Sequence, residues 1–218
     1  MKWLNQLSTS RISFYIYKLN QNDAIIYDDH LSNKQYIIII YGLLYLEKIF
    51  KNNESMCLAI LTKNTLIQLN SKIMRRDQYY YKLVSLNTSY LISFYSSNLS
   101  IKNKKHINIL ININKSYYRT LLKYEKMIHI LTHKYIKYRV IQLILLLAQE
   151  QGKITNNKIT ITTQITQSII GSIVGSNKNT IHKIINYLKQ NRIINYSNKK
   201  SEITIIDLIA LNKFKSIT

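Results

Sequence analysis

Short apolar runs separated by polar turns fill the first hundred residues of the chain. Five of these runs are rich in Ile, Leu and Tyr and have the length of strands: residues 35–41, 43–50, 55–61, 78–85 and 89–95. Polar pieces at residues 51–54 and 62–64 separate neighbouring runs. Such spacing is typical of an antiparallel sandwich or roll. The pattern therefore predicts an antiparallel sandwich or roll over residues 1–104.

The hydrophobic period changes near residue 105, where steps of three and four replace the strand pattern. This heptad pattern runs through Ile107, Leu110, Asn114, Tyr117, Leu121, Tyr124, Ile128, Leu131 and Tyr135. A pattern of this length is typical of a parallel two-helix seam, and a polar Asn114 within it can fix the register of the two helices. A single amphipathic helix packed on its own domain is the alternative. We predict a dimerisation helix over residues 105–133.

The remaining residues alternate helical and strand-like pieces. A helix with apolar residues nearly all round is expected at about residues 134–149 and ends at Gly152. A strand-like run at 158–162, two short helical segments, and a strand pair at 193–196 and 202–206 follow it. Helix, helix and basic hairpin in this order indicate a winged helix-turn-helix over residues 134–218. The predicted fold class is α+β.

Charge gives the first indication of a partner. The chain has 31 Lys and Arg against 10 Asp and Glu, for a formal net charge of +21. Between residues 151 and 201 there are eight Lys or Arg and no acidic residue. A globular chain this basic most often binds a polyanion, such as nucleic acid or an anionic surface. The C-terminal half is the part expected to face it.

Other features of the composition exclude several classes of protein. The single Cys57 cannot form a disulfide framework, a cysteine zinc site or an iron–sulfur site. The longest apolar run, residues 36–46, has 11 residues, against roughly 20 for a membrane helix. The first residues lack the apolar block of a signal peptide. We expect a soluble intracellular protein.

The chain also has an unusual bias toward four residue types. Ile, Asn, Lys and Tyr supply 106 of the 218 residues, while Pro is absent and only four Gly occur. These four types use A/T-rich codons, which indicates the genome of an organelle or of a reduced bacterium. Part of the lysine content then reflects codon use, although codon bias alone does not remove acidic residues from one block.

Residues 167–188 contain the motif most informative about function. Two helices can cross at the angle of a helix-turn-helix only if the contact residue on the first is small, and Gly171 is such a residue. Gly175 suits a turn that needs positive φ, and Ser176 can N-cap the second helix. Five residues are expected to face inward: Ile170, Val174, Ile181, Ile184 and Ile185.

Polar side chains are expected on the outer face and first turns of the second helix. They are Asn177, Lys178, Asn179, Thr180, His182 and Lys183. Such side chains can reach base edges and phosphates in a major groove. A generic helical hairpin with a solvated Lys/Asn face is the alternative. The two glycines, the basic hairpin and the acid-free block favour DNA binding, with Lys199 and Lys200 touching the DNA backbone.

Residues 170–185, IGSIVGSNKNTIHKII, closely resemble the recognition motif of the CRP/FNR superfamily of bacterial transcription regulators. The order of roll, long helix and winged helix-turn-helix also matches, and residues 36–46 look like its strand–glycine–strand roll signature around Gly42. LTHK at 131–134, followed by RVIQLILLL at 139–147, is most similar to the global nitrogen-regulator branch. Versions of these regulators are encoded in red algal plastids, which fits the composition and implies the plastid stroma. A bacterial cytoplasm is the alternative.

The resemblance assigns DNA-contacting roles to individual residues. It implies base-reading roles for Lys178, Asn179 and Lys183. Positions that touch phosphate or support the helix fall on Thr166, Gln167, Ser168, Ser176 and Thr180. Relatives place Arg where this chain has Lys178 and Lys183, which lack the bidentate fork toward guanine. The implied partners are a second copy of the chain, a palindromic DNA duplex with GTA and TAC half-sites, and RNA polymerase.

The resemblance also limits the effector. The phosphate cradle of cyclic-nucleotide binders is missing, which predicts that the roll does not bind cyclic nucleotides. In the nitrogen-regulator branch 2-oxoglutarate is the effector; its backbone turn aligns with residues 67–70 here, its roll Arg with Gln78 and its helix Arg with Thr120. Glu125 matches the helix Glu. A dicarboxylate needs cations, and the remaining candidates are Arg75, Arg76, Lys82 and Arg119.

Enzymatic functions find no support in the sequence. His129 and His133 are four residues apart, but Ile130 stands where a zinc protease carries its catalytic Glu. Residues 28–30 read as a polar turn, and no nucleophile–base pair can be assigned. A basic RNA-binding or ribosome-associated protein remains an alternative, since stacking tyrosines at residues 79–81 could read single-stranded RNA. We expect a homodimeric transcription regulator and no enzyme.

Overall fold

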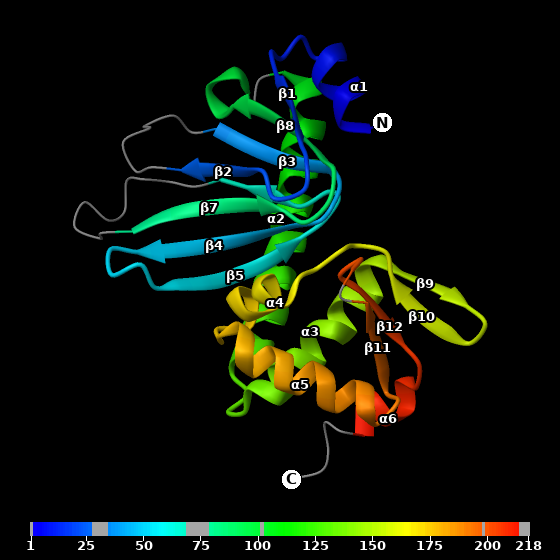
Figure 1. Cartoon of the computed structure of the whole chain (residues 1–218). Coiled ribbons are helices and arrows are strands. Elements are labelled where there is room, and N and C mark those ends of the chain that lie inside the picture. Colours follow the sequence, from blue (N-terminus) through cyan, green and yellow to red (C-terminus); the bar gives the residue numbers. More distant parts are fainter. Residues whose placement is uncertain (1, 28–34, 69–78, 101–102, 198, 214–218) are drawn as a thin grey trace. The chain divides into compact units, whose positions relative to one another are not determined.

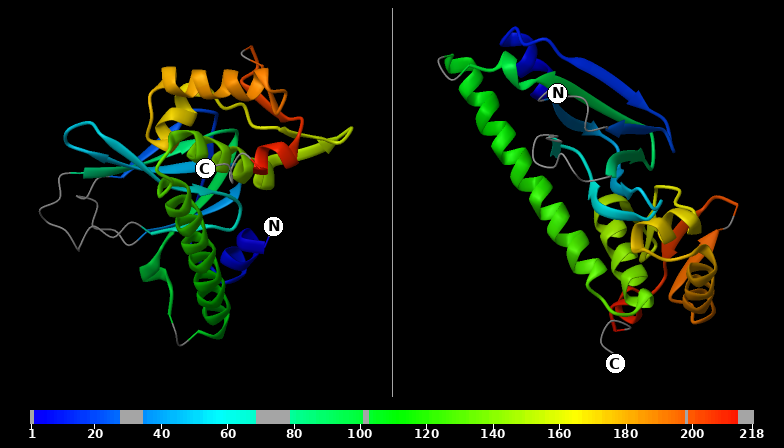
Figure 2. Two further views of the ribbon diagram at one scale, coloured as in Figure 1. Left: turned by 90° about the horizontal axis from the view of Figure 1, so that it is seen from below. Right: turned by 90° about the vertical axis from the view of Figure 1, so that its left-hand side faces the viewer.

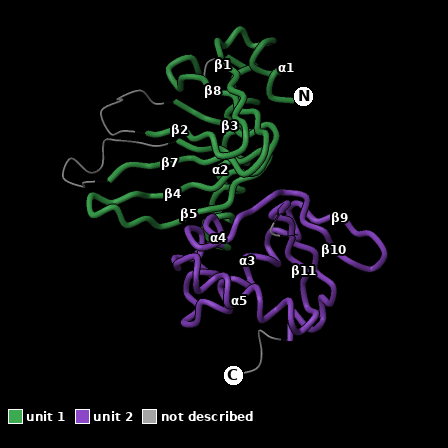
Figure 3. The backbone as a smooth tube through the Cα atoms, in the orientation of Figure 1, with its two compact units in different colours: residues 1–126 green, residues 127–218 purple. Residues whose placement is uncertain are grey.

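The computed structural model describes residues 2–27, 35–68, 79–100, 103–197 and 199–213 (Figure 1). The chain divides into two compact units, Met1–Lys126 and Met127–Thr218 (Figure 3). Since helix α2 spans residues 104–131, it begins in the first unit and ends in the second. Each unit is described by itself below.

The first unit contains two four-stranded antiparallel sheets, with strand orders β1-β8-β3-β6 and β2-β7-β4-β5. The elements are α1 (Lys2–Thr9), β1 (Tyr15–Leu19), β2 (Ala24–Tyr27), β3 (Gln35–Tyr41), β4 (Leu44–Phe50), β5 (Ser55–Leu61), β6 (Leu66–Ile67), β7 (Tyr79–Ser85), β8 (Ser89–Tyr95), a 3-10 turn (Ser96–Asn98) and α2 (Lys104–Leu131). The predicted roll is confirmed. The predicted runs correspond to β3, β4, β5, β7 and β8, and the pattern missed β1, β2 and β6.

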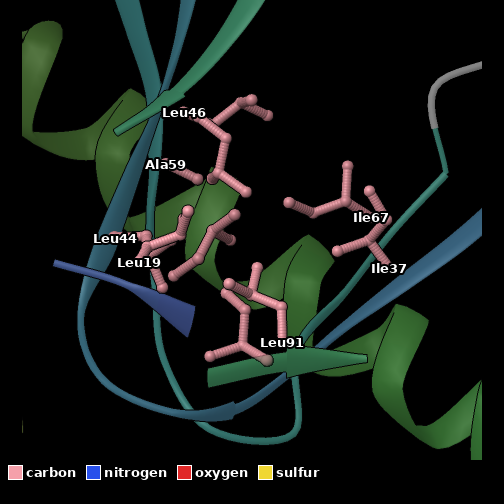
Figure 4. Close-up of a cluster of buried hydrophobic side chains, with 10 residues drawn as sticks. Leu19, Ile37, Leu44, Leu46, Ala59, Ile67 and Leu91 are labelled. Atoms are coloured by element: carbon pink, nitrogen blue, oxygen red, sulfur yellow. The ribbon is translucent and has the colours of Figure 1, made fainter. Parts of the chain in front are cut away.

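The core between the two sheets explains the near-continuous apolar runs. Ile37 and Ile39 of β3 point into a cluster with Leu44 and Leu46 of β4, where the side chains converge (Figure 4). Ile38, between them, points to the opposite face, because successive strand residues alternate. There it joins a second cluster that includes Trp3 and Leu7 of α1 and Ile109 and Ile113 of α2. β3 is therefore covered on both faces and needs apolar residues at successive positions.

The turn between β3 and β4 depends on Gly42, as the strand–glycine–strand signature predicts. Gly42 has a φ of 106°, which L side chains rarely adopt, and an added Cβ would overlap Ser89. Only glycine fits both the backbone conformation and the space.

Helix α2 packs one buried stripe against the roll, whose strands lie along one side of it (Figure 2, right). Within this stripe the Thr120 hydroxyl has three possible hydrogen-bond contacts. It accepts from the Leu66 N–H at 2.9 Å, and its single hydrogen can go to the Leu66 carbonyl at 2.8 Å or to the Ser116 carbonyl at 3.0 Å. Thr120 is only 5% exposed. The hydroxyl therefore satisfies the backbone of short strand β6.

Thr120→Val should destabilise the first unit, although the valine side chain has nearly the same shape as that of threonine. The substitution leaves the Leu66 N–H and carbonyl without their side-chain partner in a buried place, which costs about 1–3 kcal/mol. Thermal unfolding of Thr120→Val is compared with that of Thr132→Val, whose exposed hydroxyl donates only to the His129 carbonyl in the last turn of α2. Equal stability of the two variants would contradict this role of Thr120.

The predicted heptad seam is partly wrong. Leu110, Tyr117 and Tyr124 do not face outward; they pack against the two core clusters of the roll. Tyr135 lies outside α2, at the N-cap of α3. The exposed apolar side chains of α2 are instead Ile107, Ile111, Tyr118, Leu121, Leu122 and Ile128. The apolar pattern of the helix thus belongs to two faces, of which the roll covers one.

The second unit combines helices with a small antiparallel sheet of order β11-β12-β10-β9. Its elements after α2 are α3 (Ile136–Gln151), β9 (Gly152–Thr155), β10 (Lys158–Ile161), α4 (Gln167–Val174), α5 (Lys178–Gln190), β11 (Ile194–Ser197), β12 (Glu202–Ile205) and α6 (Leu208–Lys213). α3 buries six apolar residues and ends at Gly152, as predicted. Gly152 has extended backbone, and glycine is needed because a Cβ would overlap the Ala148 carbonyl. Among the described residues, no helix is long and apolar enough to cross a bilayer.

Candidate nucleic-acid interface

Two glycines set the crossing of α4 and α5, in the roles that the sequence predicts. A Cβ on Gly171 would lie 2.6 Å from the Ser176 carbonyl oxygen, so the two helices can approach only without a side chain there. Gly175 ends α4 in the left-handed conformation, with φ 70° and ψ 50°. At the other end of α4, the Thr166 side chain accepts a bond from the Ile169 N–H at 3.3 Å. α4 is therefore capped at both ends.

The N-cap of α5 is Asn177, and the predicted cap at Ser176 is wrong. The Asn177 side-chain oxygen accepts from the Thr180 N–H at 2.8 Å. The Ser176 N–H donates to the Gly171 carbonyl at 2.9 Å, which is the six-residue closing bond of a Schellman motif. Ser176 still belongs to the end of α4, so the cap falls one residue later.

Helix α5 separates an apolar face from a polar one. Ile181, Ile185 and Leu188 are fully buried, together with Ile170 and Val174 of α4. Ile184 is half-buried. The exposed residues of the first two turns are Lys178, Asn179, His182 and Lys183. Because the N-terminal turn of a helix also carries partial positive charge, this face suits a phosphate backbone and base edges.

The supporting positions divide into exposed and buried ones. Thr166 and Ser168 are exposed near the start of α4, and Thr180 is half-buried. Gln167 is only 7% exposed, and its side-chain oxygen lies 3.1 Å from His182 Nδ1. The side chain of Gln167 is therefore engaged within the protein.

Strands β11 and β12 form the predicted basic hairpin. Ile194 pairs with Ile205 at its open end, and Ser197 pairs with Glu202 next to the turn. Lys199 and Lys200 lie exposed in the turn between the strands. β12 also pairs with β10, so the hairpin is an edge of the four-stranded sheet (Figure 1).

Arg139 is a structural contact that the sequence reasoning missed. Its Nε donates to the His133 carbonyl at 2.8 Å, and its Nη1 donates to the Val174 carbonyl at 3.2 Å. Val174 is the last residue of α4, directly before the turn to α5. Arg139 therefore joins the start of α3 to the turn of the helix pair. No local pattern announces this contact, because the partners lie 35 residues apart.

Arg139→Met should loosen the helix pair. Methionine keeps much of the length but offers no donor to either carbonyl, so we expect a loss of about 1–3 kcal/mol of stability. Thermal unfolding measures this loss, with Lys189→Met at the exposed end of α5 as the matched control. An unchanged midpoint for Arg139→Met would mean that the two carbonyls do not need their guanidinium partner.

The described part of the structure does not bring the candidate effector-binding residues together in one site. Arg75, Arg76, Gln78 and the turn at residues 69–70 lie outside the described residues, as do residues 28–30. Lys82 of β7 stands opposite Glu47 of β4; burial raises the pKa of the Glu47 carboxyl, and the charge of Lys82 partly offsets this. Arg119 and Glu125 are exposed on α2. Within the described residues, no hydrogen bond or ion pair joins Lys82, Arg119 and Glu125.

Comparison with known proteins matches this part of the chain to a described domain. Residues 138–214, which include α4, α5 and the basic hairpin, match the Crp-like helix-turn-helix domain. This part of the chain therefore carries a Crp-like helix-turn-helix, the DNA-binding domain of the family that the sequence resembles. A helix-turn-helix of this type makes the chain a DNA-binding transcription regulator.

Relatives match nearly the full length of this chain. The HTH-type transcriptional regulator ycf28 of Porphyra purpurea is 29% identical over 97% of this chain and 86% of its own length. The global nitrogen regulator of Synechococcus elongatus is 20% identical over 95% of this chain and 93% of its own.

Solved structures of regulators show the same fold. A CRP-family transcriptional regulator from Thermus thermophilus superposes with a TM-score of 0.72 at 11% identity, covering 93% of this chain and 97% of its own. FixK2 from Bradyrhizobium japonicum gives 0.70 at 13% identity, covering 95% and 100%. The roll, long helix and winged helix-turn-helix are therefore the CRP-like fold.

Proposed function

We propose that this chain is a homodimeric regulator that reads a palindromic operator with α5 and controls nitrogen-responsive genes in a red algal plastid, together with RNA polymerase. The exposed face of α5, with Lys178, Asn179 and Lys183 opposite a fully buried apolar face, is the observation that supports operator reading most directly. The relative from the red alga Porphyra supports the plastid, and the name of the Synechococcus relative, a global nitrogen regulator, supports the nitrogen response.

Homodimerisation is supported by the uncovered face of α2. Ile107, Ile111, Asn114, Tyr118, Leu121, Glu125 and Ile128 follow steps of four and three along this face. Five of the seven are apolar and 40–63% exposed. This is the spacing of a two-helix seam, and a second copy of the chain supplies an identical helix. We call these seven residues the α2 seam.

Binding to duplexes tests the proposal. Two α5 helices related by a two-fold axis must enter successive major grooves, so an inverted repeat with half-sites about 34 Å apart should bind best. We expect the purified protein to prefer such GTA–TAC duplexes to scrambled ones of equal length. Equal affinity for all duplexes, or a preference for RNA, would contradict operator reading.

Replacing lysines of α5 by alanine should change DNA affinity in a different way from replacing lysines of the hairpin. Lys199→Ala or Lys200→Ala should weaken all duplexes alike and lower the salt slope by about one, because a backbone contact releases a counterion. Lys178→Ala or Lys183→Ala should cost about 1–3 kcal/mol on the matched operator and less on scrambled DNA. Fluorescence titrations at several salt concentrations separate the two classes. Equal losses on both duplexes would make Lys178 and Lys183 phosphate contacts instead.

For the effector, we propose 2-oxoglutarate, with Arg75, Arg76, Lys82 and Arg119 as the candidate cations and Glu125 as the counterpart of the family's helix Glu. The position of the family's helix Arg holds buried Thr120, whose hydroxyl is bonded to Leu66, so the cation must come from another residue. Operator titrations with and without 2-oxoglutarate should show a change in affinity that Lys82→Ala or Arg119→Ala abolishes. An affinity that ignores 2-oxoglutarate would contradict this effector assignment.

A further inference from the structure

A chain of hydrogen bonds links the two helices of the helix-turn-helix at their polar face. Gln167 Oε1 at the start of α4 lies 3.1 Å from His182 Nδ1, and His182 Nε2 lies 2.8 Å from Asn186 Nδ2. Gln167 is 7% exposed and fixed by burial, while His182 is exposed. The two amides thus hold both nitrogens of one imidazole.

The donors and acceptors in this chain follow one direction. The Gln167 oxygen can only accept, so the His182 Nδ1 carries the hydrogen and donates it. His182 Nε2 is then an acceptor and takes one hydrogen from the Asn186 amide nitrogen. The amide of Asn186 keeps its oxygen and its second N–H for another partner. One acceptor and one donor on a planar amide form the pair that binds the N6 and N7 edge of adenine.

Asn186 lies on the polar face of α5. It follows Asn179 by seven residues and Lys183 by three, so the three share a side of the helix, opposite buried Ile181 and Leu188. Asn186 is partly exposed and makes its bond to His182 through one hydrogen only. Its amide therefore can face whatever the polar side of α5 binds.

We infer that Asn186 is an additional adenine-reading residue and that His182, held by Gln167, is the residue that positions its amide. This assignment rests on the proposed reading of DNA by α5 and adds one A·T pair to what each half-site must contain. The composition of the outer face of α5 fits a base-reading role for Asn186. Its amide would supply a fixed donor–acceptor pair, whereas Lys178 and Lys183 supply only cations.

A base-specific loss in a His182 variant is a readout that a purely structural role would not give. Without the imidazole, the Asn186 amide loses the partner that orients it, so discrimination should fall at one base pair and at no other.

The experiment replaces each A·T pair of the operator half-site by G·C in turn and measures binding of wild type, Asn186→Ala and the matched control Gln190→Ala. Replacing one particular A·T pair should weaken the binding of wild type and of Gln190→Ala. At that pair, Asn186→Ala should discriminate A·T from G·C about tenfold less than wild type does. His182→Ala should lose discrimination at the same pair as Asn186→Ala and at no other, because its imidazole orients the amide of Asn186.

Two outcomes would overturn the inference. If Asn186→Ala weakens every duplex equally, the residue contacts phosphate and reads no base. If it changes nothing, Asn186 does not reach DNA. Asn179→Ala and Lys183→Ala distinguish these outcomes from failure of the proposed function. If these two variants also bind the operator as wild type does, α5 does not contact the DNA.

Discussion

The double substitution Leu121→Glu and Ile128→Glu should convert the protein into monomers and remove operator binding. Both side chains belong to the α2 seam, and they are 63% and 61% exposed in the single chain. Burial of a Leu or Ile contributes about 1.5–3 kcal/mol, so four lost side chains weaken a dimer by about 6 kcal/mol or more. The introduced carboxylates would also face their symmetry mates, which adds repulsion.

Analytical ultracentrifugation measures this loss of association, and operator titration measures its consequence. Lys105→Glu is the matched control, since it places the same charge on an exposed position in the first turn of α2, where the helix dipole favours an acid. Fold retention is checked by circular dichroism. A double variant that sediments as wild type would place the dimer interface on another surface.

Gly171→Val should abolish operator binding by forcing the helix pair apart. Even a Cβ at this position would lie 2.6 Å from the Ser176 carbonyl oxygen and 3.6 Å from Ile181 Cγ1, and the carbonyl belongs to backbone that cannot rotate away. Overpacking of this kind costs about 1–3 kcal/mol, and the isopropyl group adds to it. Because α5 must then shift against α4, we expect operator affinity to fall by about 100-fold or more, as a small displacement misplaces every base contact.

Two variants calibrate the effect of Gly171→Val. Ser172→Ala changes an exposed neighbour on α4 whose hydroxyl bonds only the Ser168 carbonyl, so it should bind operator as wild type does. Gly175→Ala meets only Arg139 Nη1 at 3.8 Å, and its cost is the backbone strain of about 1–2 kcal/mol at a φ of 70°. If Gly171→Val bound operator normally, the close approach of α4 and the turn would not be needed for DNA recognition.

Local sterics allowed the sequence to predict the helix-turn-helix in detail. A small residue at a helix crossing and a glycine at positive φ are requirements of a few neighbouring atoms, so Gly171 and Gly175 could be assigned without the fold. The buried positions Ile170, Val174, Ile181 and Ile185 followed from helical periodicity in the same way. The strands of the roll were recognised from short apolar runs, but β1, whose first four residues are exposed, gave no such signal.

Long-range packing decided the rest, because it depends on which surface meets which. The apolar pattern of α2 fits two stripes, and only the roll shows that Leu110, Tyr117 and Tyr124 belong to its own core while Ile111 and Tyr118 stay uncovered. A capping residue is fixed by the backbone path after Gly175, which placed the cap at Asn177. The bonds of Arg139 to Val174 and of Gln167 to His182 join residues 35 and 15 positions apart. Periodicity and local sterics were enough to place most of the elements and the DNA-binding motif. The uncovered face of α2 and the residues that hold α5 emerged only from the packing of the folded chain, since periodicity identifies an apolar face but not its partner.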